Sequence, residues 1–246
     1  MKSTERHKLK EDEFARSMAR ARQTLESRQR DITLAIVAVV VVLVAVAGYA
    51  WWRQARTASA NTALASAMAV HESPVIAPAA PAPGSPIPLQ QPGTFPTERA
   101  KLEAALPRFL DAAERYPTTD AGIAARYHAA ATLAELGRHS EAEQRYQEVI
   151  DRAGGRIYAR TARLGLADVQ VAQGKYDNAI AIYTELSRDS GSPLPVDGIL
   201  MQLGRAYAKA GKPEDAARAF NRVVEEFPQS AYATDARREM EAARKG

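Results

Sequence analysis

A pattern of glycine, alanine and an aromatic residue returns every 37 residues along the C-terminal half of the chain. Its copies begin at Gly137, Gly174 and Gly211, and an earlier partial copy keeps Ala105 and Phe109 without the glycine. A fixed period of about this length is typical of helical hairpins that stack side by side instead of closing around one globular core. Such stacks usually present surfaces that hold other proteins, so the repeat indicates a binding module and not an enzyme.

Each repeat unit is predicted to contain two helices, and the last unit carries the clearest pattern. Apolar residues mark one face of each helix at helical spacing: Leu200, Leu203, Ala206 and Tyr207 in the first, then Ala216, Phe220 and Val223 in the second. Gly211 is expected to end the first helix, and Pro213 suits the first turn of the next one, where a missing N–H is harmless. The position of the repeated alanine requires a small side chain because the two helices approach closely there. The repeated aromatic ring is expected to fill the gap to the next hairpin.

The last unit resembles a tetratricopeptide repeat through Leu203, Gly204, Tyr207, Ala216, Phe220 and Pro228. The two preceding units are similar to the same family through Ala167, Gly174, Tyr176, Ala179 and Tyr183, and through Leu133, Gly137, Ala142 and Tyr146. An earlier half-unit keeps Ala105, Phe109, Ala112 and Pro117, and its first helix would be residues 57–70. The resemblance covers residues 98–246 and implies an all-α solenoid of helical hairpins. The charged stretch Ser230–Arg244 is expected to form a capping helix.

An uncharged segment of 21 residues, Ile32 to Trp52, precedes the repeats. As a helix it would span a hydrocarbon layer of about 30 Å. Tyr49, Trp51 and Trp52 at its end suit the headgroup region of a membrane. Nine basic residues precede the segment, whereas only two arginines follow it closely, so the positive-inside rule places the N-terminus in the cytoplasm and the repeats outside. A cleaved signal peptide is the alternative, since Ala58-Ser59-Ala60 resembles a cleavage site.

The composition divides the chain into five segments. Residues 1–31 are mixed in charge and are expected to lie in the cytoplasm as a solvated helix beside the membrane. The alternative is a helix that lies on the anionic inner leaflet or contacts a cytoplasmic partner. A proline-rich linker follows the membrane segment, with eight of the 14 prolines and no charged residue. Fully extended, this linker would reach about 75 Å. The predicted organisation is a cytoplasmic segment over 1–31, a transmembrane helix over 32–52, a helical extension over 53–72, the linker over 73–97 and the repeat domain over 98–246.

The sequence contains no arrangement that suits catalysis, a cofactor or a metal ion. Cysteine is absent, which excludes disulfides, thiol catalysis and zinc–thiolate sites. The four histidines, His7, His71, His128 and His139, include no pair at metal-ligand spacing. No phosphate-binding loop or nucleophile-elbow motif occurs. Beyond residue 31 the chain has 24 basic and 23 acidic residues, which argues against nucleic-acid binding. We therefore expect no enzymatic activity, no cofactor and no small-molecule substrate.

The resemblance also implies which residues meet a partner. In tetratricopeptide repeats the first helix of each hairpin lines a concave groove, and the partner-binding residues carried over by position are Tyr127, His128, Glu135, Leu164, Asp168, Val171, Met201, Gln202, Arg205 and Lys209. This mixture of apolar and charged side chains suits an extended peptide or an exposed segment of a partner protein. It lacks the cluster of basic residues that would bind a C-terminal carboxylate.

With its anchor and repeats together, the chain resembles the ancillary subunit of the bacterial Sec translocon. That family is a single-pass inner-membrane protein with a periplasmic repeat domain, linked to periplasmic chaperones. The repeats are also similar to the periplasmic cell-division coordinator of the Tol-Pal system. The first resemblance implies a periplasmic scaffold that binds proteins or exported polypeptides near the translocon. The second implies, as the alternative, a coordinator of cell division or outer-membrane assembly.

Overall fold

The computed structural model describes residues 29–77, 91–154, 157–189, 191 and 193–245 of the chain. The predicted cytoplasmic helix and the middle of the proline-rich segment lie outside this part. The described residues form helices and no strand, which confirms the predicted all-α architecture. The helices are α2 (Gln29–His71), α3 (Glu98–Arg115), α4 (Asp120–Glu135), α5 (His139–Ala153), α6 (Ile157–Ala172), α7 (Tyr176–Leu186), α8 (Val196–Lys209), α9 (Pro213–Glu226) and α10 (Ala233–Lys245).

The chain divides into two compact units, Met1–Ala55 and Arg56–Gly246. In the first unit, the described part of α2 exposes its apolar side chains on every face. Trp51, for instance, keeps 74% of its surface open to solvent. Thr33–His71 contains a stretch that is long and apolar enough to cross a membrane. The helix continues without a break to His71, so the last part of α2 belongs to the second unit.

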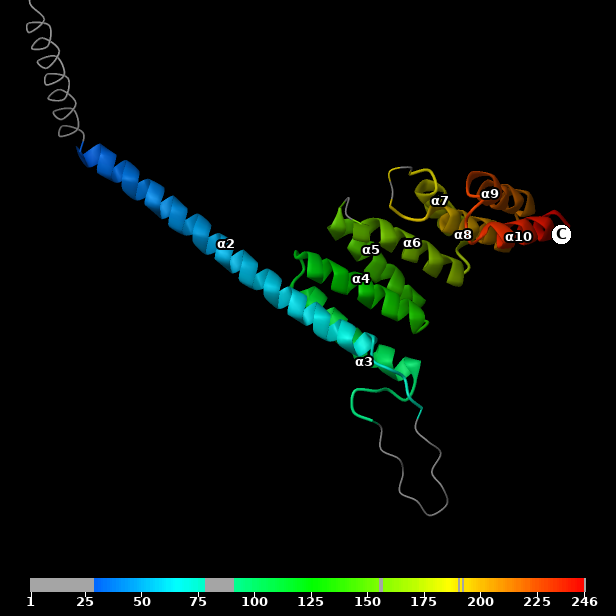
Figure 1. The fold of residues 1–246 in the computed structure, drawn as a ribbon, viewed down its shortest axis with the longest axis horizontal. Helices are drawn as coiled ribbons and strands as arrows, with labels where there is room; N and C mark the ends of the chain where they lie inside the picture. Colours follow the sequence, from blue (N-terminus) through cyan, green and yellow to red (C-terminus); the bar gives the residue numbers. More distant parts are fainter. Residues whose placement is uncertain (1–28, 78–90, 155–156, 190, 192, 246) are drawn as a thin grey trace, which may run out of the picture. The chain divides into compact units, whose positions relative to one another are not determined.

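The second unit is a solenoid in which each helix from α3 to α10 packs against the next one in the chain (Figure 1). The pairs α4/α5, α6/α7 and α8/α9 are the three hairpins that the repeat predicted. A further contact joins α4 to α6, the first helices of successive hairpins. Because contacts are local in this way, the concave surface between first helices is built from residues of neighbouring repeats.

The repeated glycines end the first helix of each hairpin, as predicted. Gly137, Gly174 and Gly211 have φ values of +75°, +74° and +72°, a left-handed conformation that glycine adopts without steric strain. The residue after each glycine donates its backbone N–H to a carbonyl five residues back, for example Arg138 to Leu133 at 2.9 Å. This is the pattern of a Schellman cap, which satisfies the last carbonyls of the helix and turns the chain sharply.

The repeated alanines and aromatic residues are buried in all four copies, which confirms their predicted role in the core. The alanines are Ala105, Ala142, Ala179 and Ala216, and the aromatic residues are Phe109, Tyr146, Tyr183 and Phe220. Glycines on first helices make room for two of the rings. A Cβ on Gly204 would lie 2.4 Å from the Phe220 ring, and one on Gly165 would lie 2.5 Å from the Tyr146 ring. The absence of a side chain therefore lets each ring lie directly against the helix backbone.

Residues 56–71 of α2 pack on α3 in the second unit. Ala67 is buried in the same cluster as Ala105 and Phe109. The guanidinium of Arg56 donates to the carbonyl of Arg115 at 3.3 Å. These contacts form the extra hairpin that the half-unit at Ala105 predicted, with residues 57–70 as its first helix. These contacts argue for including residues 56–71 in the repeat domain. The predicted limits of the linker, residues 73–97, and the predicted start of the repeat domain at residue 98 remain predictions.

The two ends of the proline-rich segment are held together by a short backbone bridge between Val75 and Phe95. The N–H of Ile76 donates to the carbonyl of Phe95 at 2.9 Å, and the N–H of Phe95 donates to the carbonyl of Pro74 at 3.0 Å. The segment therefore leaves and rejoins the second unit at one place, between α2 and α3.

Candidate partner-binding groove

The ten residues predicted to meet a partner all lie on first helices, namely α4, α6 and α8. Glu135, Asp168, Gln202 and Lys209 are exposed, and four more are half-buried: Tyr127, His128, Leu164 and Val171. The prediction is wrong for Met201, which is 1% exposed and packs inside the core of the last hairpins. That side chain therefore belongs to the hydrophobic core and is not available to a partner.

Arg205 is half-buried and already has a partner within the chain. Its guanidinium binds Glu239 of α10, with N–O distances of 2.7, 3.1 and 3.2 Å. The charged hydrogen bond to Glu239 raises the pKa of Arg205. The capping helix therefore occupies the end of the surface that α8 would offer. The accessible part of the groove lies toward α4 and α6.

Aromatic rings cluster around two of the predicted groove residues of α4, Tyr127 and His128. The ring of Tyr127 lies 6.0 Å from that of Tyr146 and 5.8 Å from that of Tyr158, between ring centres. His128, the next residue, stacks on Phe109 at 5.3 Å, and Phe109 in turn contacts His71 at 5.8 Å. These rings come from five different helices, α2 to α6, so only the folded solenoid brings them together.

A pocket of about 320 Å³ opens between α4, α5 and α6. We call it the Asp168 pocket, and the residues that line it are Ala131, Ala134, Glu135, His139, Tyr146, Gly165, Asp168, Val169 and Ala172. Small side chains form most of its wall, and this makes the surface concave. Its polar groups come from two predicted groove residues, Glu135 and Asp168, and from Tyr146 and His139, whose role at this surface the sequence did not reveal.

Asp168 is the most unusual carboxylate of the groove. Its side chain is exposed at the mouth of the pocket, and partial desolvation by the surrounding helices raises its pKa. A hydrogen bond from the Tyr183 hydroxyl, at 2.5 Å, acts in the opposite direction. Burial and the charge of Asp168 also raise the pKa of Tyr183. The pair therefore consists of a buried, neutral phenol that donates to a carboxylate at the protein surface.

Most other carboxylates around the groove have a cationic partner. Glu143 of α5 accepts from Gln170, Gln173 and Lys175, and the bond from Lys175 is the largest cause of its lowered pKa. Glu185 pairs with Arg163 at 2.6 Å. The contact of Glu143 with Lys175 joins two neighbouring hairpins, whereas the pair of Arg163 and Glu185 joins α6 and α7 within one hairpin. They position the helices and leave these carboxylates already neutralised.

His128 should make the stability of the second unit depend on pH. Burial lowers its pKa, the nearby His71 lowers it further, and Glu72 opposes this. The folded protein therefore favours the neutral ring, whereas the unfolded chain takes up a proton near pH 6.5. Stability is expected to be complete above about pH 6.5 and to decrease as the pH falls below it. Thermal unfolding between pH 7.5 and 5.5 should show a smaller decrease for His128→Phe than for a control, His139→Gln. Equal decreases in both variants would contradict this role of His128.

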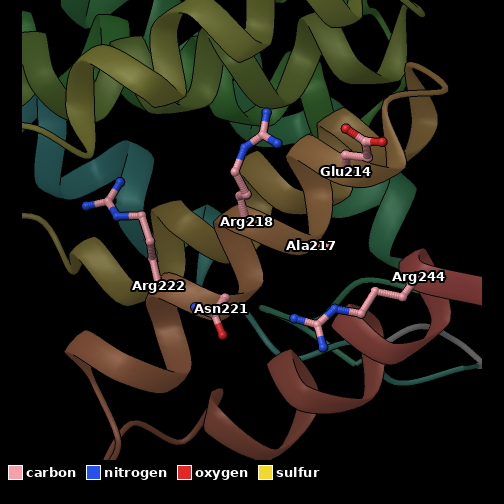
Figure 2. A pocket seen from close by; sticks show the side chains of 6 residues that line it. All are labelled: Glu214, Ala217, Arg218, Asn221, Arg222 and Arg244. Atoms are coloured by element: carbon pink, nitrogen blue, oxygen red, sulfur yellow. The ribbon is translucent and has the colours of Figure 1, made fainter.

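A second pocket, of about 560 Å³, lies on α9 and α10 and is lined by Glu214, Ala217, Arg218, Asn221, Arg222 and Arg244. Figure 2 shows five of these residues on α9 and Arg244 on α10. Its three arginines suggest an anion site, but Arg218 pairs with Asp215 and Arg222 with Glu226, each within α9. Such pairs are typical of a solvated helix face. Among the described residues, no group of three or more histidine, aspartate or glutamate side chains could hold a metal ion.

Comparison with known proteins agrees with this architecture. Residues 29–243 match the family model described as a tetratricopeptide repeat-like domain. Among solved structures, the chain is similar to nearly identical TPR-like repeats attributed to a kinesin light chain of Podosopora anserina, with TM-score 0.52 and 14% identity over 59% of this chain and 78% of that one. It is also similar to a tetratricopeptide repeat protein from Parabacteroides merdae, with TM-score 0.50 and 17% identity over 60% of this chain and 56% of that one. No curated protein matches the sequence.

Proposed function

The chain belongs to the tetratricopeptide repeat-like domain family, and from this premise we propose that it is a membrane-anchored scaffold that binds proteins. Repeats of this family are suited to protein–protein interaction, and no catalytic family is indicated. The family match begins at residue 29, so it includes the apolar part of α2 as well as the repeats.

The apolar side chains of α2 support the anchor. Those between Leu34 and Trp52 are more than half exposed, on all faces of the helix. An uncharged helix surface of this length is unfavourable in water and favourable in a lipid bilayer. The excess of basic residues before residue 31 favours a cytoplasmic N-terminus. The repeats would then lie in the periplasm of a bacterial envelope, tethered to the inner membrane.

The groove on α4 and α6 is the single observation that carries the binding function. It combines exposed carboxylates with half-buried aromatic rings, and both kinds of group can contact an extended polypeptide. A tethered groove of this kind would meet polypeptides as they leave the membrane. We therefore propose that the protein assists the Sec translocon and periplasmic chaperones, with division or outer-membrane assembly as the alternative role.

Crosslinking in intact cells tests the orientation and the partner together. A membrane-impermeant, amine-reactive crosslinker should react with the repeats, which carry Lys101, Lys175 and Lys212, and should capture translocon subunits or chaperones. The full-length protein would be purified in mild detergent and its partners identified by mass spectrometry. A matched bait that keeps residues 1–55 but lacks the second unit should recover none of them.

Each other outcome has a distinct meaning. Capture of Tol-Pal or cell-wall synthesis proteins would replace the translocon role with the division role. Recovery of the same partners by the matched bait would show that the anchor, and not the groove, binds them. Crosslinking that occurs only after the cells are opened would contradict the periplasmic orientation.

A further inference from the structure

The Asp168 pocket brings two carboxylates from different helices to one hollow. Glu135 comes from the last turn of α4, and Asp168 comes from the middle of α6. Burial is the largest cause of the raised pKa of Tyr127 and Tyr146, and both charges raise it further, so both act on the same group of phenols. With a volume of about 320 Å³, the pocket lies at the small end of the range for ligand pockets in proteins. It can admit one long side chain together with water.

No cation of the described chain neutralises these two carboxylates, in contrast to their neighbours. Glu143, Glu148 and Glu185 each form an ion pair with a lysine or arginine. Neither Glu135 nor Asp168 forms one among the residues that the structure describes. Within the described ranges, Asp168 has only the neutral hydroxyl of Tyr183 as its hydrogen-bond partner. The pocket therefore carries uncompensated negative charge in a site that is partly shielded from water, where a bound cation gains most.

An unpartnered polar side chain also points to a ligand. Tyr146 is 4% exposed and lines the pocket, and no hydrogen bond of its hydroxyl occurs in the described part of the chain. Burial and the neighbouring Tyr127, Asp168 and Glu135 raise its pKa, so it remains a neutral phenol. Its hydroxyl oxygen can accept a hydrogen bond from a cationic donor. A buried Nδ1 atom of His139, on the same wall, lacks a partner as well.

We propose that the Asp168 pocket receives a lysine or arginine side chain of the partner polypeptide, held between Glu135, Asp168 and the Tyr146 hydroxyl. The inference rests on the proposed groove function and specifies the partner's chemistry. Charged hydrogen bonds to the carboxylates would fix the head of the side chain, and the alanines of the wall would contact its apolar stem. The pocket is thus opposite in charge to a site that binds a terminal carboxylate.

The decisive variant is Asp168→Asn, because it removes the charge without disturbing the fold. An asparagine oxygen still accepts the hydrogen bond from Tyr183. The raised pKa of Asp168 means that the folded protein disfavours the ionised form. Neutralising it is therefore expected to leave the thermal midpoint at pH 7 unchanged or to raise it. Glu135→Gln is the second test variant, and Glu225→Gln is the matched control, since Glu225 is exposed on α9, away from the pocket.

The experiment selects binders from a random nonapeptide library on the full-length protein in detergent micelles, at about 150 mM salt. We expect peptides with lysine or arginine at one fixed position, and the ratio of the two shows which head group fits better. Binding of a selected peptide should be about tenfold weaker to Asp168→Asn and Glu135→Gln and unchanged for Glu225→Gln. Norleucine at the basic position should weaken binding to the native protein by a similar factor.

The remaining results separate this inference from the function on which it rests. Selected peptides without a fixed basic position would overturn the cation pocket and leave groove binding intact. Equal loss in all three variants would indicate a general charge effect and would also overturn the pocket. Failure to select any peptide would count against the groove itself and so against both.

Discussion

Phe220→Ala is expected to lower the free energy of unfolding by about 3–5 kcal/mol, the loss typical of a buried aromatic ring. The ring is 1% exposed and lies in the hydrophobic core of the last hairpins. It rests against the backbone of α8 at Gly204, where even a single methyl group would not fit beside it. Removing the ring therefore leaves a cavity between two helices whose backbones cannot easily close it. Thermal unfolding of the full-length protein in detergent, followed by circular dichroism, measures the effect.

Tyr232→Ala provides the control for this prediction. It removes a ring of similar size from the same end of the solenoid, but that ring is 42% exposed. Tyr232→Ala should lower the free energy of unfolding by less than half as much as Phe220→Ala does. Equal effects would mean that Phe220 does not fill the core in the way described.

Ala179→Leu is expected to destabilise the second hairpin by about 1–3 kcal/mol, because three additional carbon atoms have no space between α6 and α7. Ala179 has no exposed surface and packs within the hydrophobic core of the last hairpins. An alanine recurs at this position in every copy because the two helices of a hairpin approach closely there. The larger side chain must push the helices apart or adopt a strained rotamer.

Ala181→Leu is the matched control, since it makes the same substitution two residues along α7 at an exposed position. Alanine and leucine differ little in helix propensity, so this variant should unfold close to the native temperature. Unchanged unfolding of Ala179→Leu would contradict the repeat register on which the fold was predicted.

The solenoid could be predicted from the sequence because the residue type at each repeated position is required by its local structure. The glycines were identified from their period, and their positive φ values and caps follow from the chemistry of glycine. The alanines and aromatic rings are buried because they lie on the facing sides of amphipathic helices. The half-unit at Ala105 also predicted its missing helix, although a long proline-rich insertion separates the two in sequence.

The groove was less predictable. The position of a residue in the repeat pattern indicates on which helix it lies, but not which residues of neighbouring helices it contacts. Met201 was predicted as a groove residue from its position in the pattern, yet the packing of α8 on its neighbours buries it. The pairing of Arg205 with Glu239 depends on where the capping helix docks, which no local pattern specifies. Tyr146 was assigned to the core, and its ring is buried, but the position of its hydroxyl in the pocket required the packed arrangement of three helices.

The bridge between Val75 and Phe95 makes the intervening segment a place where the protein can be enlarged. The backbone hydrogen bonds of Phe95 with Pro74 and Ile76 fix the two ends of this segment. The packing of α2 on α3 should therefore not depend on the number of residues between those ends. Doubling such a loop adds only about 0.6 kcal/mol of closure entropy. Evolution can therefore lengthen or shorten this segment freely, and an experimenter can insert a fluorescent domain there to follow the protein in living cells while both ends of the chain remain native.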